Sequence, residues 1–373
     1  MAGLLAKVRA TFDTLPDTRR AQSVTFTMSD TLSSALAMFS LKYSSLLQFD
    51  TAMRGDAGTA RHNLRTLFGV TQAPCDSQMR DILDPVDPST LRPAFRSLHS
   101  ALQRGNVLKK FACNESKILL SMDGTGLFAS SKTSCKHCCV KKRKSGDEFY
   151  HQLLAAAIVH PDLKRALPLD FEPITRHDGN NKNDCERNAG KRLLNSIRQQ
   201  YPDRQFVVLE DALAANGPLI RELLRHEMDF IIGAKPGSNA ALFDEVGTRL
   251  HCSECTESAE NDLNEKGLGC GFRFTNDLAL NDSHPDLRVN FIEYWEFDKK
   301  GKQTIFAWVT NLPISADNAY EIARAGRTRW KVENELFNVI KHKGYNLEHS
   351  YAYGKQFLCS TLGGLMLLAF LID

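Results

Sequence analysis

Two aspartates stand at positions where the ends of buried strands are predicted. Asp123 directly follows the apolar run SKILLSM (116–122), and Asp211 ends the segment RQFVVLED (204–211). Short apolar runs predict strands that are buried on both faces, and α/β folds place their sites at the carboxyl ends of such strands. For either residue alone, an aspartate that begins a turn is the alternative interpretation.

A third acidic residue, Glu333, lies in the predicted helix RTRWKVENELFNVIKHK (327–343). In an α-helix it would share one face with four apolar residues, namely Trp330, Leu336, Phe337 and Ile340. A buried carboxylate without a partner costs on the order of several kcal/mol, so Glu333 needs a cation. Arg329, four residues earlier, is one candidate, and a bound metal ion is the other.

Carboxylates that converge on one point repel each other unless cations lie between them. If Asp123, Asp211 and Glu333 come together, they suit Mg²⁺ or Mn²⁺, which are hard ions that prefer oxygen ligands. Two such ions about 4 Å apart activate a water or a 3′-hydroxyl and stabilise the leaving oxygen of a phosphodiester. The three residues are therefore predicted to be metal ligands and catalytic residues.

Alternating strands and helices around these residues predict an α/β protein in three parts. Residues 1–112 are helical and rich in loops, and they form an N-terminal domain that either binds DNA or only packs. Residues 113–237 and 306–373 form the predicted core. Residues 238–305 alternate charged residues with short β-like runs and are predicted to be a β-rich insertion.

Several segments of the chain resemble the DDE transposases of bacterial insertion sequences, which have an RNase H-like core. Together they span about residues 115 to 373. The resemblance implies that Asp123 and Asp211 end neighbouring core strands, and that Glu333 follows on a helix after a β insertion. The segments are SMDGTGLFASSK (121–132), YHQLLAAAIVHPD (150–162), DGNNKNDCERNAGKR (178–192), VLEDALAANGP (208–218), FAWVTNLP (306–313) and RTRWKVENELFNVIKHKGYNLEHSYAYGKQ (327–356).

The chain departs from the best-known members around the third carboxylate. Those members carry a Tyr three residues before the Arg and a Lys seven residues after the Glu. Here Arg329 and Glu333 match, but Gly326 and Ile340 occupy the other two positions. Lys341 follows one residue later, rotated by about 100° on a helix. The chain is therefore expected to belong to a distinct subgroup.

Two cysteine pairs, Cys135 with Cys138 and Cys252 with Cys255, have the spacing of metal ligands. Together they could hold one tetrahedral structural Zn²⁺. The alternative is that all four are ordinary free thiols, because the sequence does not show that the two pairs meet.

Basic residues cluster in two segments that could contact DNA phosphates. KTSCKHCCVKKRKSG (132–146) contains no acid, and its central residues are Lys141, Lys142, Arg143 and Lys144. Arg329, Lys331 and Lys341 surround Glu333. A solvated loop is the alternative interpretation of the first segment.

Composition excludes several other classes of protein. The 373 residues are 42% hydrophobic with a formal net charge of +3, and ten cysteines are too few for a disulfide scaffold. No signal segment is evident, so a reducing cytoplasmic location is expected. The apolar segment 357–372 is too short to span a bilayer and predicts a buried helix. It ends one residue before the chain does, which suggests a truncated frame.

Three functions remain open at this stage. The first is a transposase that binds the ends of its own element and joins them to target DNA, acting as a homodimer because two ends must meet. The second is an RNase H-like nuclease without strand transfer. The third is a truncated, inactive DNA-binding remnant.

Overall fold

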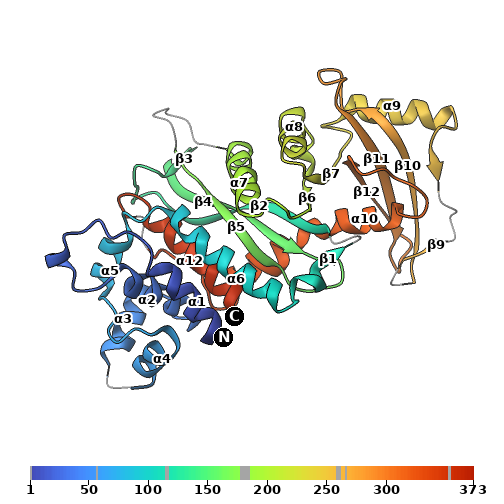
Figure 1. The fold of residues 1–373 in the computed structure, drawn as a ribbon. Coiled ribbons are helices and arrows are strands. Elements are labelled where there is room, and N and C mark those ends of the chain that lie inside the picture. Colours follow the sequence, from blue (N-terminus) through green and yellow to red (C-terminus); the bar gives the residue numbers. More distant parts are fainter. Residues whose placement is uncertain are drawn as a thin grey trace.

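The computed structural model describes residues 2–55, 58–113, 117–176, 185–257, 262–264, 267–351 and 354–373. Across these residues one mixed sheet runs through the molecule, with helices on both of its faces (Figure 1). In chain order the strands are β1 (Ala112–Cys113), β2 (Lys117–Ser130), β3 (Cys139–Arg143), β4 (Gly146–Val159), β5 (Leu167–Ile174), β6 (Phe206–Glu210), β7 (Asp229–Gly233), β8 (Thr256–Glu257), β9 (Asp262–Leu263), β10 (Gly269–Ala279), β11 (Arg288–Phe297) and β12 (Gln303–Thr310).

The central strands have the arrangement of an RNase H-like core. β5, β4 and β2 are antiparallel neighbours, while β6 and β7 run parallel to β2 beside it. Apolar segments such as FVVLE of β6 suit strands covered on both faces, because branched side chains pack well on a pleated surface. The predicted α/β fold with an RNase H-like core is confirmed.

Each face of the sheet has its own hydrophobic core, as the two-residue period of a strand requires. Leu120 of β2 packs with α7 (Glu186–Gln200) and α8 (Gly217–Arg225) on one face. Leu119 packs on the other face with α10 (Ala319–Arg327) and with further helices from both ends of the chain.

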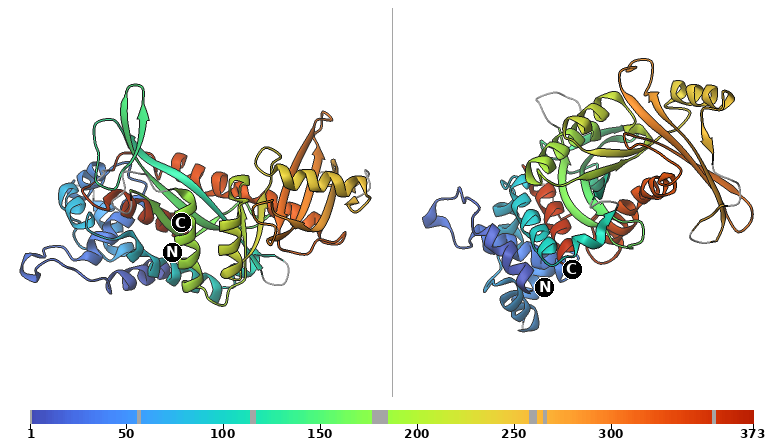
Figure 2. Two further views of the ribbon diagram at one scale, coloured as in Figure 1. Left: turned by 90° about the horizontal axis from the view of Figure 1, so that it is seen from above. Right: turned by 45° about the vertical axis from the view of Figure 1, so that its right-hand side comes forward.

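The helices of the N-terminal part share that second core with α12 (Leu358–Ile372), which contacts α2, β4 and β5. Both termini therefore lie on the same side of the molecule (Figure 2). Within the described residues, no helix combines the length and apolarity needed to cross a membrane. The N-terminal helices are α1 (Ala2–Phe12), α2 (Met28–Ser40), α3 (Leu46–Arg54), α4 (Gly58–Phe68), α5 (Asp76–Leu83) and α6 (Arg92–Arg104).

The segment predicted as an insertion begins with a helix, α9 (Ala240–His251), which the sequence analysis did not anticipate. Its strands do not form a separate sheet. β12 pairs with β7 through Val309 and Ile232, and β11 and β10 extend the same sheet beyond it. This part lies at the end of the molecule away from the N-terminal helices (Figure 1). The division of the chain at residues 112, 238 and 305 stays a prediction.

Candidate active site

Asp123 lies within β2 rather than at its end. The parallel pairing of β2 with β6 stops at Ser121 and Leu209, but β2 continues as the partner of β4. Asp123 is thus placed just past the carboxyl edge of the parallel strands, where such folds build their sites. Its side chain is 28% exposed, and its Oδ1 accepts the backbone N–H of Gly124 at 2.9 Å.

Asp211 directly follows β6, as predicted. Its Oδ1 accepts the backbone N–H of Leu213 at 2.8 Å and so caps the short 3₁₀ turn Ala212–Ala214. The preceding residue, Glu210, is half-buried. Burial raises the pKa of Glu210 well above its ordinary value, and the nearby carboxylates of Asp211 and Asp123 raise it further.

The two aspartates open onto one cavity of about 650 Å³, which Glu210 and Glu186 also line. Glu186 lies in the first turn of α7, and its carboxylate occupies the space where any side chain at Gly124 would be. This close approach explains the glycine after Asp123. Desolvation raises the pKa of Glu186, and Asp211 adds to the rise. The sequence analysis missed Glu186, because only the fold brings the start of α7 over β2.

Glu333 lies near Asp123 but is not buried. The guanidinium of Arg329 lies between them, 2.7 Å from Glu333 Oε1 and 3.8 Å from Asp123 Oδ2. Ser121 Oγ donates to the backbone carbonyl of Arg329 at 2.9 Å, which fixes this turn against β2. The Glu333 side chain is 48% exposed, so the predicted burial of Glu333 is wrong.

The error has a geometric cause in the helix that carries Glu333. After α10 the chain forms a 3₁₀ turn, Thr328–Trp330, and then a π-helical segment, Val332–Phe337, before α11 (Asn338–His342). A π-helical turn takes more residues than an α-helical one, so the spacing that marks one α-helical face does not apply. Trp330 is accordingly 44% exposed, and the buried residues are Val332, Leu336, Phe337 and Ile340.

The acidic side chains of the site repel each other. Burial and the charge of Glu333 raise the pKa of Asp123, Arg329 opposes the rise, and the resulting pKa is about 6. Elevated pKa values at Asp123, Glu186 and Glu210 mark a group of carboxylates that lacks full charge compensation from the protein. Hard oxygen donors of this kind suit a divalent ion of the Mg²⁺ or Mn²⁺ type. Within the described residues, no three of these carboxylates bring their oxygens within 4.8 Å of one another, so they would have to draw closer to share one ion.

The first predicted basic segment forms the hairpin of β3 and β4, which projects from the body of the molecule (Figure 2, left). Asp147 lies opposite Lys142, and Glu148 accepts from Arg143 at 2.9 Å, so acids offset part of the hairpin's charge. We call its four exposed basic residues the basic hairpin: Lys141, Lys142, Arg143 and Lys144.

The second predicted basic cluster is mostly engaged within the protein. Lys331 is only 7% exposed. Its ammonium group donates to the backbone carbonyls of His160, Pro161 and Leu163 at 2.6, 2.6 and 2.7 Å. Lys331 therefore supports the fold, and its prediction as a DNA contact is wrong.

Two further residues of that cluster are engaged with acids. Lys341 pairs with Glu348 at 2.9 Å, and Arg329 bonds Glu333. Either basic side chain can exchange its glutamate partner for a DNA phosphate. Contact of Lys341 and Arg329 with DNA therefore stays a prediction.

The two cysteine pairs do not meet. Cys135 and Cys138 precede β3, whereas Cys252 and Cys255 follow α9 at the other end of the molecule (Figure 1). The predicted zinc site shared by all four cysteines is therefore wrong. The Cys138 thiol donates to Cys135 Sγ at 3.4 Å, and this bond together with the neighbouring His151 lowers the pKa of Cys135 to about 4. His151 lies beside this first pair.

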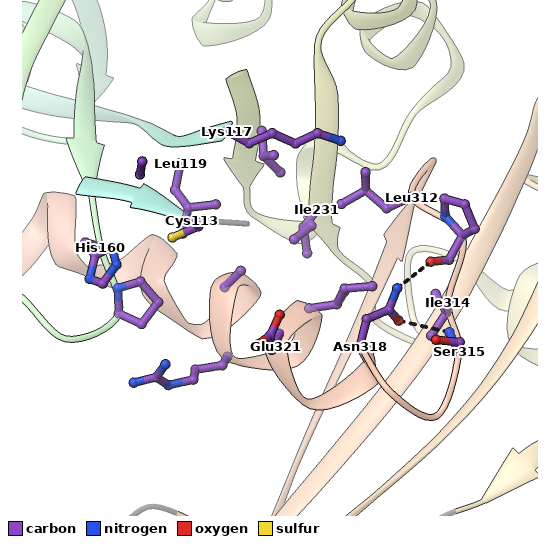
Figure 3. A pocket seen from close by; sticks show the side chains of 17 residues that line it. Cys113, Lys117, Leu119, His160, Ile231, Leu312, Ile314, Ser315, Asn318 and Glu321 are labelled. Carbon is purple, nitrogen blue, oxygen red and sulfur yellow. Dashed lines mark hydrogen bonds between the residues drawn. The ribbon is translucent and has the colours of Figure 1, made fainter. Parts of the chain in front are cut away.

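A second cavity, of about 870 Å³, lies between the sheet and α10 and contains none of the predicted catalytic residues (Figure 3). Asn318, which lines it, is held by local bonds. Its amide donates to the carbonyl of Pro313 at 2.9 Å and accepts the N–H of Ser315 at 2.9 Å. These bonds serve the turn before α10, so we assign no chemistry to this cavity.

Comparison with known proteins assigns the class of the molecule. The family model described as the transposase DDE domain matches residues 117–371, which is more than half of the chain. The chain therefore belongs to the DDE transposase family. It is a DNA transposase, and enzymes of this family cleave DNA and transfer its strands with the help of divalent metal ions.

Among the solved structures similar to the chain are two of low identity. One is the synaptic complex of the piggyBac transposase with hairpin DNA, at 12% identity and a TM-score of 0.42, covering 99% of this chain and 72% of that one. The other is the NurA nuclease from Sulfolobus solfataricus, at 11% identity and a TM-score of 0.27, covering 67% and 93%. No curated protein matches the chain.

Proposed function

We propose that Asp123, Asp211 and Glu333 are the catalytic carboxylates of this transposase and that they hold Mg²⁺ or Mn²⁺. One observation carries the proposal: Asp123 and Asp211, from neighbouring strands, line one cavity, and Arg329 links Glu333 to Asp123. When bound, such ions activate a water or a 3′-hydroxyl and stabilise the leaving oxygen of the phosphodiester.

The protein's own part is to position the carboxylates and to balance their charge. The paired strands fix the spacing of the two aspartates, and the buried side of the π-helical segment anchors Glu333. Glu210 keeps a proton more readily than an ordinary glutamate, which limits the repulsion around Asp211. Arg329 offsets part of the negative charge of Asp123 and Glu333 in the metal-free protein, and it turns to a DNA phosphate when metal ions take over that role.

The substrate we propose is the pair of ends of a bacterial insertion sequence. The basic hairpin contacts phosphates near the scissile strand, so binding weakens as salt increases. Because two ends have to be cut and joined together, the active species is a homodimer on DNA.

Catalytic assays on full-length protein test the triad. Duplexes carrying the inverted repeats that flank the gene are incubated with Mg²⁺ or Mn²⁺, and cleavage and strand transfer are measured separately. Asp123→Asn, Asp211→Asn and Glu333→Gln are each expected to slow cleavage by roughly 1,000-fold or more. DNA affinity should stay within about threefold, because phosphate contacts supply most of it.

Glu335→Gln is the matched control, since Glu335 lies on the same π-helical segment as Glu333 but lines a different pocket, together with Tyr294 and Arg327. It is expected to cleave at the normal rate. If Asp211→Asn keeps full activity while Glu210→Gln does not, Glu210 is the second carboxylate and the proposed triad is wrong. Cleavage by the wild type without any joined product would restrict the activity to that of a nuclease.

A further inference from the structure

We propose that Cys135, Cys138 and His151 bind a structural zinc ion, with Cys359 as the fourth ligand. The site would join the base of the basic hairpin to the C-terminal helix α12. It lies apart from the cavity of the catalytic carboxylates and does not depend on their role.

The three side chains already stand at the separations that a tetrahedral ion requires. His151 Nε2 lies 3.2 Å from Cys135 Sγ and 3.4 Å from Cys138 Sγ, and the two sulfurs are 3.4 Å apart. Zinc–ligand bonds of ordinary length place two sulfurs about 3.8 Å apart, and a sulfur and a nitrogen about 3.6 Å apart. Zinc binding would thus move each atom by only a few tenths of an ångström.

The backbone aims these side chains at one point. Cys135 and Cys138 are separated by two residues, the spacing by which a tight turn presents two sulfurs to one zinc ion. His151 lies in β4 opposite a β-bulge, where Leu127 and Phe128 of β2 face a single residue. Bulges redirect side chains in this way. His151 and Cys138 are each only 1% exposed, so these soft donors are held inside the protein.

The start of α12 brings a further thiol to this place. The ring of His137, between the two cysteines, stacks on Phe357 with centroids 5.0 Å apart. Cys359 follows two residues later and lines a small cavity together with Leu127 and Phe128 of the bulge. The start of α12, with Cys359 on it, therefore lies beside both the turn that carries the two cysteines and the bulge opposite His151.

The ligand atoms of the first three residues lie within 4.8 Å of one another, and Cys359 is not part of that group. Its sulfur has to move inward when zinc binds. A disulfide between Cys135 and Cys138 is the competing chemistry, but it needs a sulfur separation of about 2.05 Å, far shorter than the 3.4 Å that separates them. Three sulfurs and one imidazole nitrogen form a common structural zinc set.

Zinc would stiffen the base of the DNA-contacting arm. β3 begins at Cys139, directly after the second ligand, and the basic hairpin forms its far end. Without zinc, the hairpin is held by the pairing of β3 with β4, and the start of α12 by backbone N–H groups that donate to Asp84. Zinc would add a direct link between the two. Zinc therefore makes the position of the basic hairpin depend on the folded C-terminal helix.

Metal analysis of full-length protein tests the site directly. Wild-type protein from zinc-supplemented medium should contain about one zinc ion per chain, and cobalt replacement should give the charge-transfer and d–d bands of a tetrahedral thiolate site. Cys135→Ser, Cys138→Ser and His151→Ala should each abolish stoichiometric zinc. Cys359→Ser should weaken zinc binding by about 10-fold to 100-fold. Trypsin should cut the basic hairpin faster after chelation.

The double variant Cys252→Ser, Cys255→Ser is the matched control and should keep its zinc, because that pair lies elsewhere. If the serine variants fail to fold, Cys138→His serves as the test instead. It retains a ligand at this position and should therefore keep zinc. Wild-type protein without zinc, or with a Cys135–Cys138 disulfide under reducing purification, would overturn the proposal. Unchanged zinc content in Cys135→Ser would also overturn it. Unchanged zinc affinity in Cys359→Ser would remove only Cys359 from the ligand set.

Discussion

Arg329 is the residue that organises the acidic site in the absence of metal ions. It bonds Glu333 at 2.7 Å and approaches Asp123 at 3.8 Å, while its backbone carbonyl is held by Ser121. One guanidinium cannot neutralise several carboxylates, and burial together with Glu333 still raises the pKa of Asp123 to about 6. The site is thus prepared for a stronger cation, and Arg329 can be released when one arrives.

Glu333→Gln separates a catalytic role from a structural one. The Arg329–Glu333 pair is exposed enough that its loss should change the free energy of unfolding by less than about 1 kcal/mol. Strand cleavage should nevertheless be abolished. Urea unfolding without metal, together with the cleavage assay, measures both quantities. A loss of roughly 3 kcal/mol or more would identify a structural ion pair, as expected when a buried pair is broken, and would weaken the catalytic assignment.

At the scale of single residues, the sequence was most informative about the strands. Asp123 and Asp211 were selected because each follows an apolar run, and the fold places both on one cavity. Glu186 could not be found, because its approach to Gly124 depends on a contact between α7 and β2. The burial of Glu333 was predicted wrongly because the sequence pattern assumes an α-helical period, whereas this segment is π-helical.

Among the elements, the basic hairpin gives a prediction about DNA binding. Changing Lys141, Lys142 and Lys144 together to Ala should reduce the slope of log affinity against log salt by about 2 to 3, because each phosphate contact contributes about 0.9. Titrations at several salt concentrations measure this slope. Changing the exposed Lys109 and Lys110 to Ala is the control and should leave it unaltered. An unchanged slope in the triple variant would mean that the hairpin is only a solvated loop.

The contact of α6 with β5 gives a prediction about pH. His99 of α6 is fully buried, and its Nε2 donates to the carbonyl of Pro168 at 2.8 Å. Burial lowers its pKa to about 4, below the ordinary value of about 6.5. The unfolded chain therefore takes up a proton first as the pH falls. The contribution of neutral His99 to the free energy of unfolding is complete above pH about 6.5. It is lost as the pH falls from about 6.5 to about 4, and the loss reaches up to about 3 kcal/mol.

His99→Gln tests this linkage, because its amide can still donate to Pro168 but does not titrate. Urea unfolding at several pH values should show a shallower loss of stability below pH about 6.5 than in the wild type. The exposed His62→Gln is the control and should follow the wild type. Equal slopes for wild type and His99→Gln would show that His99 is not the group responsible.

At the scale of the whole molecule, the local sequence pattern predicted the fold class. It did not predict how distant parts of the chain pair with one another. The alternation of strands and helices predicted the α/β class, which the structure has, whereas the division into a core and an insertion stays a prediction. The sequence placed most of the β12 segment in the predicted core, but it could not show that β10 and β11 extend the central sheet, because the pairing of β12 with β7 that connects them to it joins residues far apart in the chain. The apolar segment at the C-terminal end was predicted to be buried, and α12 packs between the sheet and the N-terminal helices.

This packing predicts that the N-terminal helices do not fold alone. α12 is apolar on all sides and is buried by β4 and β5 on one side and by α2 on another. Arg92 of α6 also bonds Asp170 and Glu172 of β5 at 3.1 and 2.6 Å, and Asp170 is only 1% exposed.

A fragment of residues 1–112 leaves the core-facing surfaces of its helices uncovered, and it also leaves Arg92 without its acids. It should therefore show helical circular dichroism without a cooperative unfolding transition, whereas full-length protein unfolds cooperatively. Co-expression with residues 113–373 is the control, and it should restore a soluble complex of the two fragments. A sharp thermal transition and dispersed amide resonances from residues 1–112 alone would contradict the shared core, and would make this part the independent domain that the sequence suggested.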